Sequence, residues 1–128
     1  MKKILIDTNI YSSAMRGDRE VIRILKKMET IGISAISVGE LLSGFKGGNR
    51  ESKNREELDF FLDSPRVVLY PVDIVTSDYY SEIINNLKKA GTPVPTNDIW
   101  IAAVAFQYGL KLFTKDAHFS FVKGLMLV

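Results

Sequence analysis

The chain has 128 residues, no cysteine and one histidine, and its 17 basic and 15 acidic side chains leave a formal net charge of +2. This length predicts one domain over residues 1–128, with a core large enough to need no disulfides. The missing cysteines exclude disulfide scaffolds, thiolate zinc sites and thiol nucleophiles, and one histidine excludes multi-imidazole metal sites. The longest nearly apolar run, residues 99–106, is too short to span a membrane. Asp7 interrupts the N-terminal apolar stretch, so we expect no signal peptide and a cytoplasmic protein.

Short apolar runs alternate with helical patterns along the whole chain. In chain order we expect a strand at 3–6, helices at about 9–16 and 19–28, a strand at 31–36, helices at about 38–45 and 52–62, a strand at 67–70, helices at 74–90 and 97–108, a strand at 112–114, a short helix or loop at 116–122, and a last strand at 125–128. The runs are continuous rather than alternating, which is typical of strands buried on both faces. This order predicts an α/β protein with a central, mainly parallel sheet of four to five strands.

Polar residues at the start of the helical patterns supply the expected caps. Thr8 and Thr96 each precede a helix as N-cap residues. Ser37 precedes the third helix, and Glu40 stands three residues later, which is the spacing of a capping box. The helix at 97–108 is apolar on nearly all sides, so we expect it to be the central buried helix.

Four of the 15 acidic residues stand at strand ends or in apolar helix turns, where an ionised carboxylate is costly unless it is paired. They are Asp7, Glu40, Asp98 and Asp116. By itself each has an ordinary structural explanation, as a helix cap, a capping box, a helix N-terminus or a turn. Because ligands of parallel sheets bind where the carboxyl ends of the strands meet, we expect these four acids to lie together.

Four converging carboxylates cannot all stay ionised without a cation. A site of oxygen ligands, with no cysteine and a single histidine, selects a hard divalent ion such as Mg²⁺ or Mn²⁺. Such ions serve phosphoryl chemistry, because they polarise the phosphate, activate water and stabilise the leaving oxygen. The residues alone therefore favour a metal-dependent enzyme that acts on phosphate esters.

Four sequence elements, taken together, resemble the PIN-domain ribonucleases and, more narrowly, the VapC-type toxins of toxin–antitoxin pairs. The elements are Asp7-Thr8-Asn9 after the first strand, Glu40-Leu41 in the third helix, Asn97-Asp98-Ile99-Trp100-Ile101-Ala102-Ala103, and Thr114-Lys115-Asp116 followed by Phe119. The resemblance implies a PIN-like three-layer α/β/α sandwich. It also implies a Mg²⁺- or Mn²⁺-dependent endoribonuclease that forms a homodimer and is held inactive by a small antitoxin, whose C-terminal segment blocks the active site.

The resemblance implies a role for each matched residue. Asp7 and Asp98 would bind the ion directly. Glu40 would bind a second ion or position the water, and Asp116 would act mostly through water. The residues that would hold these acids in place are Thr8, Asn9, Asn97 and Thr114. A metal-activated water would then hydrolyse the RNA phosphodiester in line, leaving a 5′-phosphate and a 3′-hydroxyl.

Several basic residues are candidates for contacts with RNA phosphates. The candidates are Arg16, Lys46, Arg50, Lys115 and His118. His118 stands where many relatives carry another acid, so a fifth carboxylate is missing from the expected site. We expect its imidazole to face phosphate or to support the acids rather than to act as a general acid or base. DNA would be reached only through the antitoxin, and we expect no membrane contact.

Two other functions are consistent with parts of the pattern. An aspartyl-phosphate enzyme needs a second acid close after the first strand, and Thr8-Asn9 follows Asp7 instead. A non-catalytic PIN-like scaffold that binds RNA or another protein would be favoured by the loss of an acid, and all four acids are present. Metal-dependent cleavage of RNA distinguishes the enzyme from the scaffold.

Overall fold

The computed structural model describes residues 2–128, and this part of the chain forms four strands, six α-helices and one 3₁₀ helix. In chain order they are β1 (Lys3–Ile6), α1 (Thr8–Met15), α2 (Arg19–Lys26), β2 (Thr30–Ser34), α3 (Ala35–Lys46), α4 (Glu51–Leu62), β3 (Val67–Tyr70), α5 (Ile74–Ala90), α6 (Thr96–Tyr108), β4 (Lys111–Phe113) and the 3₁₀ helix η1 (Ala117–Phe121). The strands form one parallel sheet in the order β3-β2-β1-β4. Among the helices of residues 2–128, none combines the length and the apolar character needed to cross a membrane.

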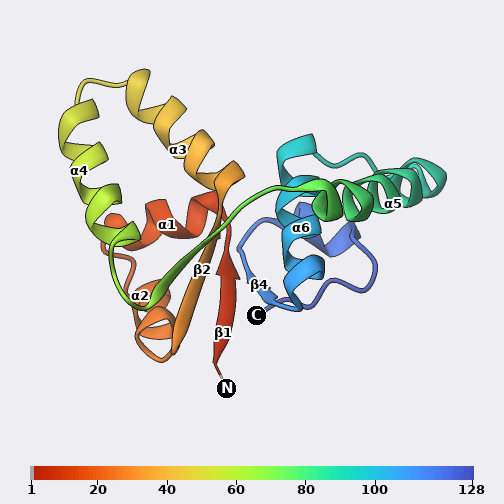
Figure 1. The fold of residues 1–128 in the computed structure, drawn as a ribbon, viewed down its shortest axis with the longest axis horizontal. Helices are drawn as coiled ribbons and strands as arrows, with labels where there is room; N and C mark the ends of the chain where they lie inside the picture. Colours follow the sequence, from red (N-terminus) through yellow and green to blue (C-terminus); the bar gives the residue numbers. More distant parts are fainter. Residues whose placement is uncertain (1) are drawn as a thin grey trace.

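The sheet lies between two groups of helices, with α1 to α4 on one side and α5 and α6 on the other (Figure 1). Side chains of β1 alternate between the two cores, because successive residues of a strand point to opposite faces. Ile4 and Ile6 pack with α1 to α4, whereas Leu5 packs with α5 and α6. All three are buried, which confirms that β1 is covered on both faces. The three-layer α/β/α sandwich expected from the sequence is therefore present.

Helix α6 is the central helix of the second core. Its residues from Ile101 to Ala105 are all buried, and so is Ile99 in its first turn. The apolar pattern at 97–108 thus predicted the buried helix correctly. Since α6 contacts both α5 and α3, its N-terminal turn is fixed relative to both groups of helices.

The strand register brings three chain segments to the same edge of the sheet. Ile6, the last residue of β1, pairs with Ile33 of β2 on one side and with Phe113 of β4 on the other. The residues that follow these strands, Asp7 and Thr114 among them, therefore leave the sheet side by side. Helix α1 begins directly after β1, so the side chain at the strand end is also at a helix N-terminus.

Three of the expected caps are wrong by one to three residues. Helix α1 is capped by Asp7 rather than by Thr8, and α6 begins at Thr96 after Pro95. Helix α3 begins at Ala35, and its cap is Ser34, whose hydroxyl accepts a hydrogen bond from the Ser37 amide at 3.1 Å. The expected strand at 31–36 therefore ends at Ser34. The apolar run continued into the first turn of the helix, which hid the boundary.

The expected last strand at 125–128 is present only in part. Leu127 forms an isolated bridge with Leu112, and the Val128 amide donates to the Leu112 carbonyl at 2.9 Å. An isolated bridge is not a strand, so the sheet has four strands, the lower of the two numbers expected.

Candidate metal centre

Asp7 occupies the most buried position among the candidate acids. Its Oδ1 accepts a hydrogen bond from the Ile10 amide at 2.9 Å, and its Oδ2 accepts one from the Thr114 hydroxyl. The residue is 4% exposed. Burial raises the pKa of Asp7, the two hydrogen bonds lower it, and the negative charges of Asp116 and Glu40 raise it again. Asp7 is thus the helix cap that its position allows, with a carboxylate that also faces other acids.

Glu40 joins three helices through its side chain. Its Oε1 accepts a hydrogen bond from the Thr8 hydroxyl at 2.6 Å, and its Oε2 accepts one from the Asn97 amide group at 3.2 Å. Thr8 belongs to α1 and Asn97 to α6, so the Glu40 carboxylate of α3 lies between them. The capping box with Ser37 is therefore wrong, because α3 begins earlier and Glu40 is no longer at its third position.

Asp98 lies in the first turn of α6, and its side chain is 18% exposed. Burial raises its pKa to about 6, and the negative charges of Asp116, Glu40 and Asp7 act in the same direction, while His118 lowers it. Within residues 2–128 no hydrogen bond reaches its carboxylate. Asp98 therefore carries an unsatisfied negative charge close to three other acids.

Asp116 and His118 complete the cluster from the segment after β4. The Asp116 carboxylate caps η1 by accepting a hydrogen bond from the His118 amide at 2.9 Å. The imidazole Nδ1 lies 3.0 Å from Oδ1 of Asp116 and 4.0 Å from Oδ2 of Asp98. One donor atom from each of these three residues lies within 4.8 Å of the others. The turn explanation of Asp116 is thus correct, and the side chain also faces Asp98.

The donor set fits a divalent cation. Burial is the main cause of the raised pKa values of Asp7 and Asp98, and the negative charges of the neighbouring acids add to it, so a positive charge among them would favour their ionised forms. Carboxylate oxygens with one imidazole suit Mg²⁺ or Mn²⁺, and the site offers no softer thiolate ligand. The geometry therefore agrees with the ion class that the sequence predicted.

Of the residues expected to hold the acids, three make such contacts. Thr8 and Asn97 donate to Glu40, and Thr114 donates to Asp7 while its oxygen accepts from the Asp116 amide at 2.9 Å. Asn9 is exposed on α1. Its side chain takes part in none of the hydrogen bonds found across residues 2–128.

Two of the basic candidates, Lys115 and Lys46, form ion pairs with carboxylates outside the four candidate acids. Lys115 pairs with Asp18 at the start of α2, with 3.0 Å between Nζ and Oδ2. Lys46 pairs with Glu51 at 3.2 Å, six residues beyond Glu40 and so about 9 Å further along α3. These two ammonium groups are thus directed at protein carboxylates.

The two arginines among the basic candidates, Arg16 and Arg50, are exposed. Arg16 donates to the Ser13 hydroxyl at 3.2 Å, and Arg50 is the N-cap residue of α4.

Sequence reasoning did not single out Ser34, which is fully buried at the carboxyl end of β2 and caps α3. A serine directly after an apolar run was the available signal.

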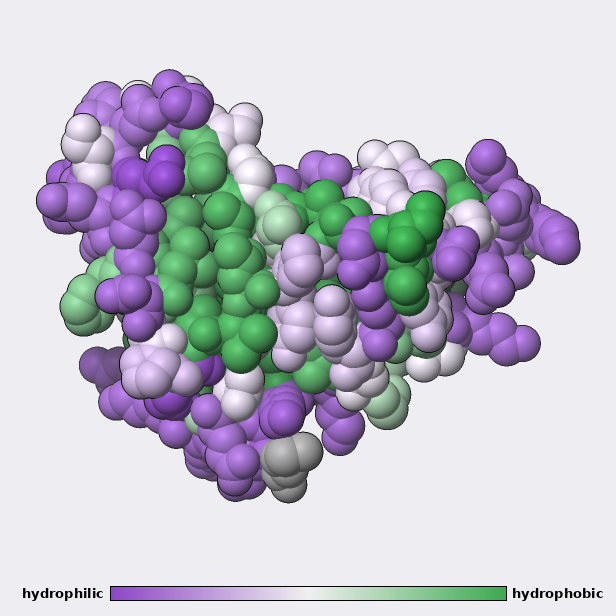
Figure 2. All heavy atoms as spheres, in the orientation of Figure 1, coloured by the Kyte–Doolittle hydropathy of each residue, from purple (hydrophilic) through white to green (hydrophobic). Residues whose placement is uncertain are grey.

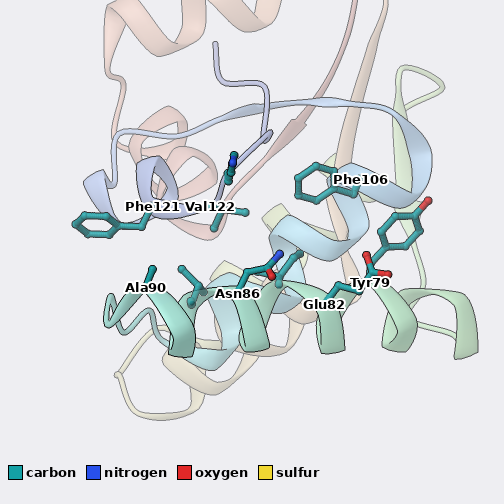
Figure 3. A pocket seen from close by; sticks show the side chains of 10 residues that line it. Tyr79, Glu82, Asn86, Ala90, Phe106, Phe121 and Val122 are labelled. Atoms are coloured by element: carbon teal, nitrogen blue, oxygen red, sulfur yellow. The ribbon is translucent and has the colours of Figure 1, made fainter.

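A separate pocket of about 450 Å³ lies between α5 and the segment around η1 (Figure 3). Its wall combines aromatic side chains with Glu82 of α5 and with Lys123, beyond η1. None of the four candidate acids lines it. The candidate site is thus defined by its converging carboxylates rather than by this pocket.

Comparison with known proteins identifies the family of the chain. The profile described as PIN domain matches residues 4–125. The chain belongs to the PIN-domain family. This PIN domain is 33% identical over 128 residues to Ribonuclease VapC1 of Rickettsia felis, covering 95% of the chain and 92% of the relative. It is 32% identical over 124 residues to Plasmid stability protein StbB of Pseudomonas syringae pv. tomato, covering 88% and 87%.

Solved structures extend the likeness to the whole fold. The crystal structure of VapBC2 from Rickettsia felis, bound to a DNA fragment from its promoter, contains a chain similar to this PIN domain with a TM-score of 0.89 and 26% identity. The match covers 98% of this chain and 97% of the other. The PIN fold, and the resemblance to VapC proteins on which its expectation rested, are therefore confirmed.

Proposed function

We propose that this PIN domain is a metal-dependent endoribonuclease of the VapC type, the toxin of a toxin–antitoxin pair. The observation that carries the proposal is the convergence of Asp7, Glu40, Asp98 and Asp116 at one edge of the sheet. In particular, Asp98 has a pKa raised to about 6 and no hydrogen-bond partner among the described residues. A bound cation would stabilise the ionised form of such a carboxylate. The relatives named VapC ribonuclease supply the substrate class, which is RNA.

The four acids would hold Mg²⁺ or Mn²⁺, which when bound activates water and stabilises negative charge on the scissile phosphate. The chain's own residues set the geometry. The Thr114 hydroxyl fixes one oxygen of Asp7 and the backbone of Asp116. Thr8 and Asn97 fix the two oxygens of Glu40. Such fixed ligands lose little freedom when an ion binds, which favours both affinity and the alignment of the phosphate.

For the partner, we propose an antitoxin that docks in the groove beside α4. Figure 2 shows apolar surface on the side of the molecule formed by α1 to α4. The groove has a volume of about 600 Å³ and is lined by Met15, Phe61 and Val67, with Glu56 and Glu57 among its polar residues. Phe60 on its wall is 84% exposed. An amphipathic segment with basic residues would cover this apolar surface and pair with the two glutamates. Solved VapBC complexes that contain a chain of the same fold support the proposal that an antitoxin supplies this amphipathic segment.

We also propose that the protein is a homodimer. The segment from β3 into α5 exposes Leu69, Ile74 and Val75, and Ile74 is 77% exposed. Apolar side chains of this size are rarely left in water on a monomer when they lie in one segment. Sedimentation of the purified protein and of the Ile74→Ser variant tests this assignment. A monomeric wild-type protein, or an unchanged dimer of the variant, contradicts it.

The activity test uses the purified chain and a labelled structured RNA. We expect cleavage with Mg²⁺ or Mn²⁺, no cleavage in EDTA, and cleavage reduced by at least about 10²-fold in Asp98→Asn. The matched control is Asp78→Asn, which removes an exposed carboxylate from α5 and leaves the cluster intact. Binding of RNA without cleavage would identify a scaffold instead. Cleavage that survives EDTA, or a wild-type rate in Asp98→Asn, contradicts the proposed role of the metal site.

A further inference from the structure

His118 contributes the only nitrogen donor side chain in the acidic cluster. Its Nδ1 is directed at the acids, 3.0 Å from Asp116 and 4.0 Å from Asp98, although the side chain is 49% exposed and has solvent available on its other side. The backbone favours this orientation, because the His118 amide is bound to the same Asp116 oxygen. His118 thus contacts Asp116 through both its backbone amide and its imidazole.

The separations between the three donor atoms match those of ligands on one ion. At metal–ligand distances of about 2.1 Å, neighbouring ligands of an octahedral ion lie about 3 Å apart and opposite ligands about 4 Å apart. The Nδ1 distances to Asp116 and Asp98 are 3.0 Å and 4.0 Å. All three donor atoms lie within 4.8 Å of one another. These separations are close to those that three ligands of a single ion require.

The other two acids are less available on this side. Both Glu40 oxygens already accept hydrogen bonds, from Thr8 and Asn97. Both Asp7 oxygens accept as well, from Ile10 and Thr114. The Asp98 carboxylate has no such partner within residues 2–128. Asp98 is therefore the acid with the most coordination capacity left, and Asp116 and the imidazole lie next to it.

We propose that His118 is a metal ligand of this chain, sharing one ion with Asp98 and Asp116, and that its Nδ1 makes the site prefer Mn²⁺ to Mg²⁺. The inference rests on the proposed function, because it assumes that the acidic cluster binds a divalent ion. Mg²⁺ favours an all-oxygen shell, whereas imidazole nitrogen binds transition-metal ions more strongly. Exchanging one oxygen ligand for a nitrogen thus raises the affinity for Mn²⁺ relative to that for Mg²⁺.

The direct test is electron spin-echo spectroscopy of Mn²⁺ bound to the purified full chain, with no RNA present. A nitrogen directly bonded to Mn²⁺ modulates the echo, and the chain's single histidine makes the assignment unambiguous. We expect this nitrogen signal in the wild-type protein and its loss in His118→Gln. Ser120→Ala, in the same 3₁₀ helix, is the matched control and should keep the signal.

A second measurement compares the dissociation constants of Mn²⁺ and Mg²⁺ by calorimetry. We expect the preference for Mn²⁺ over Mg²⁺ to fall about tenfold in His118→Asp, which restores an oxygen ligand at the same position. If His118 serves only to hydrogen-bond Asp116, Mn²⁺ binds without a bonded nitrogen and both variants keep the wild-type preference. That result overturns the inference and leaves the proposed metal site standing. Absence of Mn²⁺ binding altogether overturns both.

Discussion

Asp7 and Glu40 differ from Asp98 and Asp116 in how the protein holds them. The first pair has every carboxylate oxygen engaged by hydroxyl, amide or backbone donors. The second pair is engaged only at Asp116, by the backbone and the imidazole of His118, and the Asp98 carboxylate accepts nothing within residues 2–128. The protein itself satisfies the first pair, whereas the second pair is the part that the proposed cation would complete.

This difference teaches that burial alone does not identify a metal ligand. Asp7 is the most buried acid, yet two hydrogen bonds offset part of the cost of burying it. Asp98 is more exposed, yet burial together with the negative charges of the neighbouring acids raises its pKa to about 6, and no hydrogen bond offsets this rise. The charge that most needs a cation is thus the less buried one.

The largest effect should come from Asp98→Asn. Removing this carboxylate deletes a charge that only the cation balances, so we expect RNA cleavage to fall by about 10²–10³-fold or more. The fold should stay intact, and Asp78→Asn should cleave like the wild type. A folded Asp98→Asn variant that cleaves RNA at the wild-type rate would show that this carboxylate is not required.

Thr114→Val tests the pair that the protein itself satisfies. Valine keeps the shape of threonine but removes the hydroxyl that donates to Asp7 and accepts from the Asp116 amide. We expect a loss of about 10–100-fold in metal affinity or cleavage, since supporting hydrogen bonds of metal ligands have effects of this size. Thr30→Val is the control, because Thr30 begins β2 and so lies at the edge of the sheet opposite to the acids. Unchanged metal affinity and cleavage in Thr114→Val would contradict the supporting role.

The stability of the metal-free protein should depend on pH through Asp98. Its pKa is raised from 3.8 to about 6 in the folded protein. Between about pH 4 and pH 6 the folded state therefore holds more protons than the unfolded state, and the free energy of unfolding falls as the pH rises. The raised pKa of Asp7 acts in the same direction. The shift at Asp98 limits this loss to about 3 kcal/mol.

Thermal unfolding in EDTA at several pH values measures this effect. We expect the unfolding temperature of the wild type to drop relative to that of Asp98→Asn from pH 4 to pH 6, and the difference to stay constant above that range. Saturating Mn²⁺ at pH 7 should restore the wild type alone. A difference between the two proteins that does not vary with pH would contradict the strained charge at Asp98.

The smallest effects should come from the basic residues outside the acidic cluster. Arg50→Gln removes an exposed guanidinium, so we expect RNA affinity to fall severalfold and its salt dependence to lose about one unit of slope. Lys46→Gln should do less, because this ammonium already pairs with Glu51 at 3.2 Å. Filter binding across a salt series measures both. Equal losses in the two variants would show that the ion pair opens when RNA binds.

The sequence predicted where two of the four acids would lie, because these two follow strands. In a parallel sheet the carboxyl ends of neighbouring strands meet, so Asp7 after β1 and Asp116 shortly after β4 had to leave the sheet at one edge. Glu40 was harder, since its spacing from Ser37 matched a capping box equally well. Only the start of α3 at Ala35 excluded the capping box. The Glu40 carboxylate accepts hydrogen bonds from Thr8 and Asn97 instead.

Contacts between distant segments could not be predicted in the same way. The pairing of Lys115 with Asp18 joins residues 97 positions apart, and no local pattern encodes it. The fifth strand was also overestimated, because an apolar run at 125–128 indicates burial but not a hydrogen-bonding partner along its full length.

By itself, the sequence determined the order of strands and helices, the buried helix α6 and the oxygen-rich donor set of the candidate site, because periodicity and ligand chemistry are local properties of the chain. The tertiary structure decided which acids are satisfied and which are not. That outcome depends on the packing of α1, α3 and α6 around Glu40 and on the placement of His118 beside Asp98. Hydrogen bonds and charge interactions act over a few ångströms, and only the folded chain sets those distances.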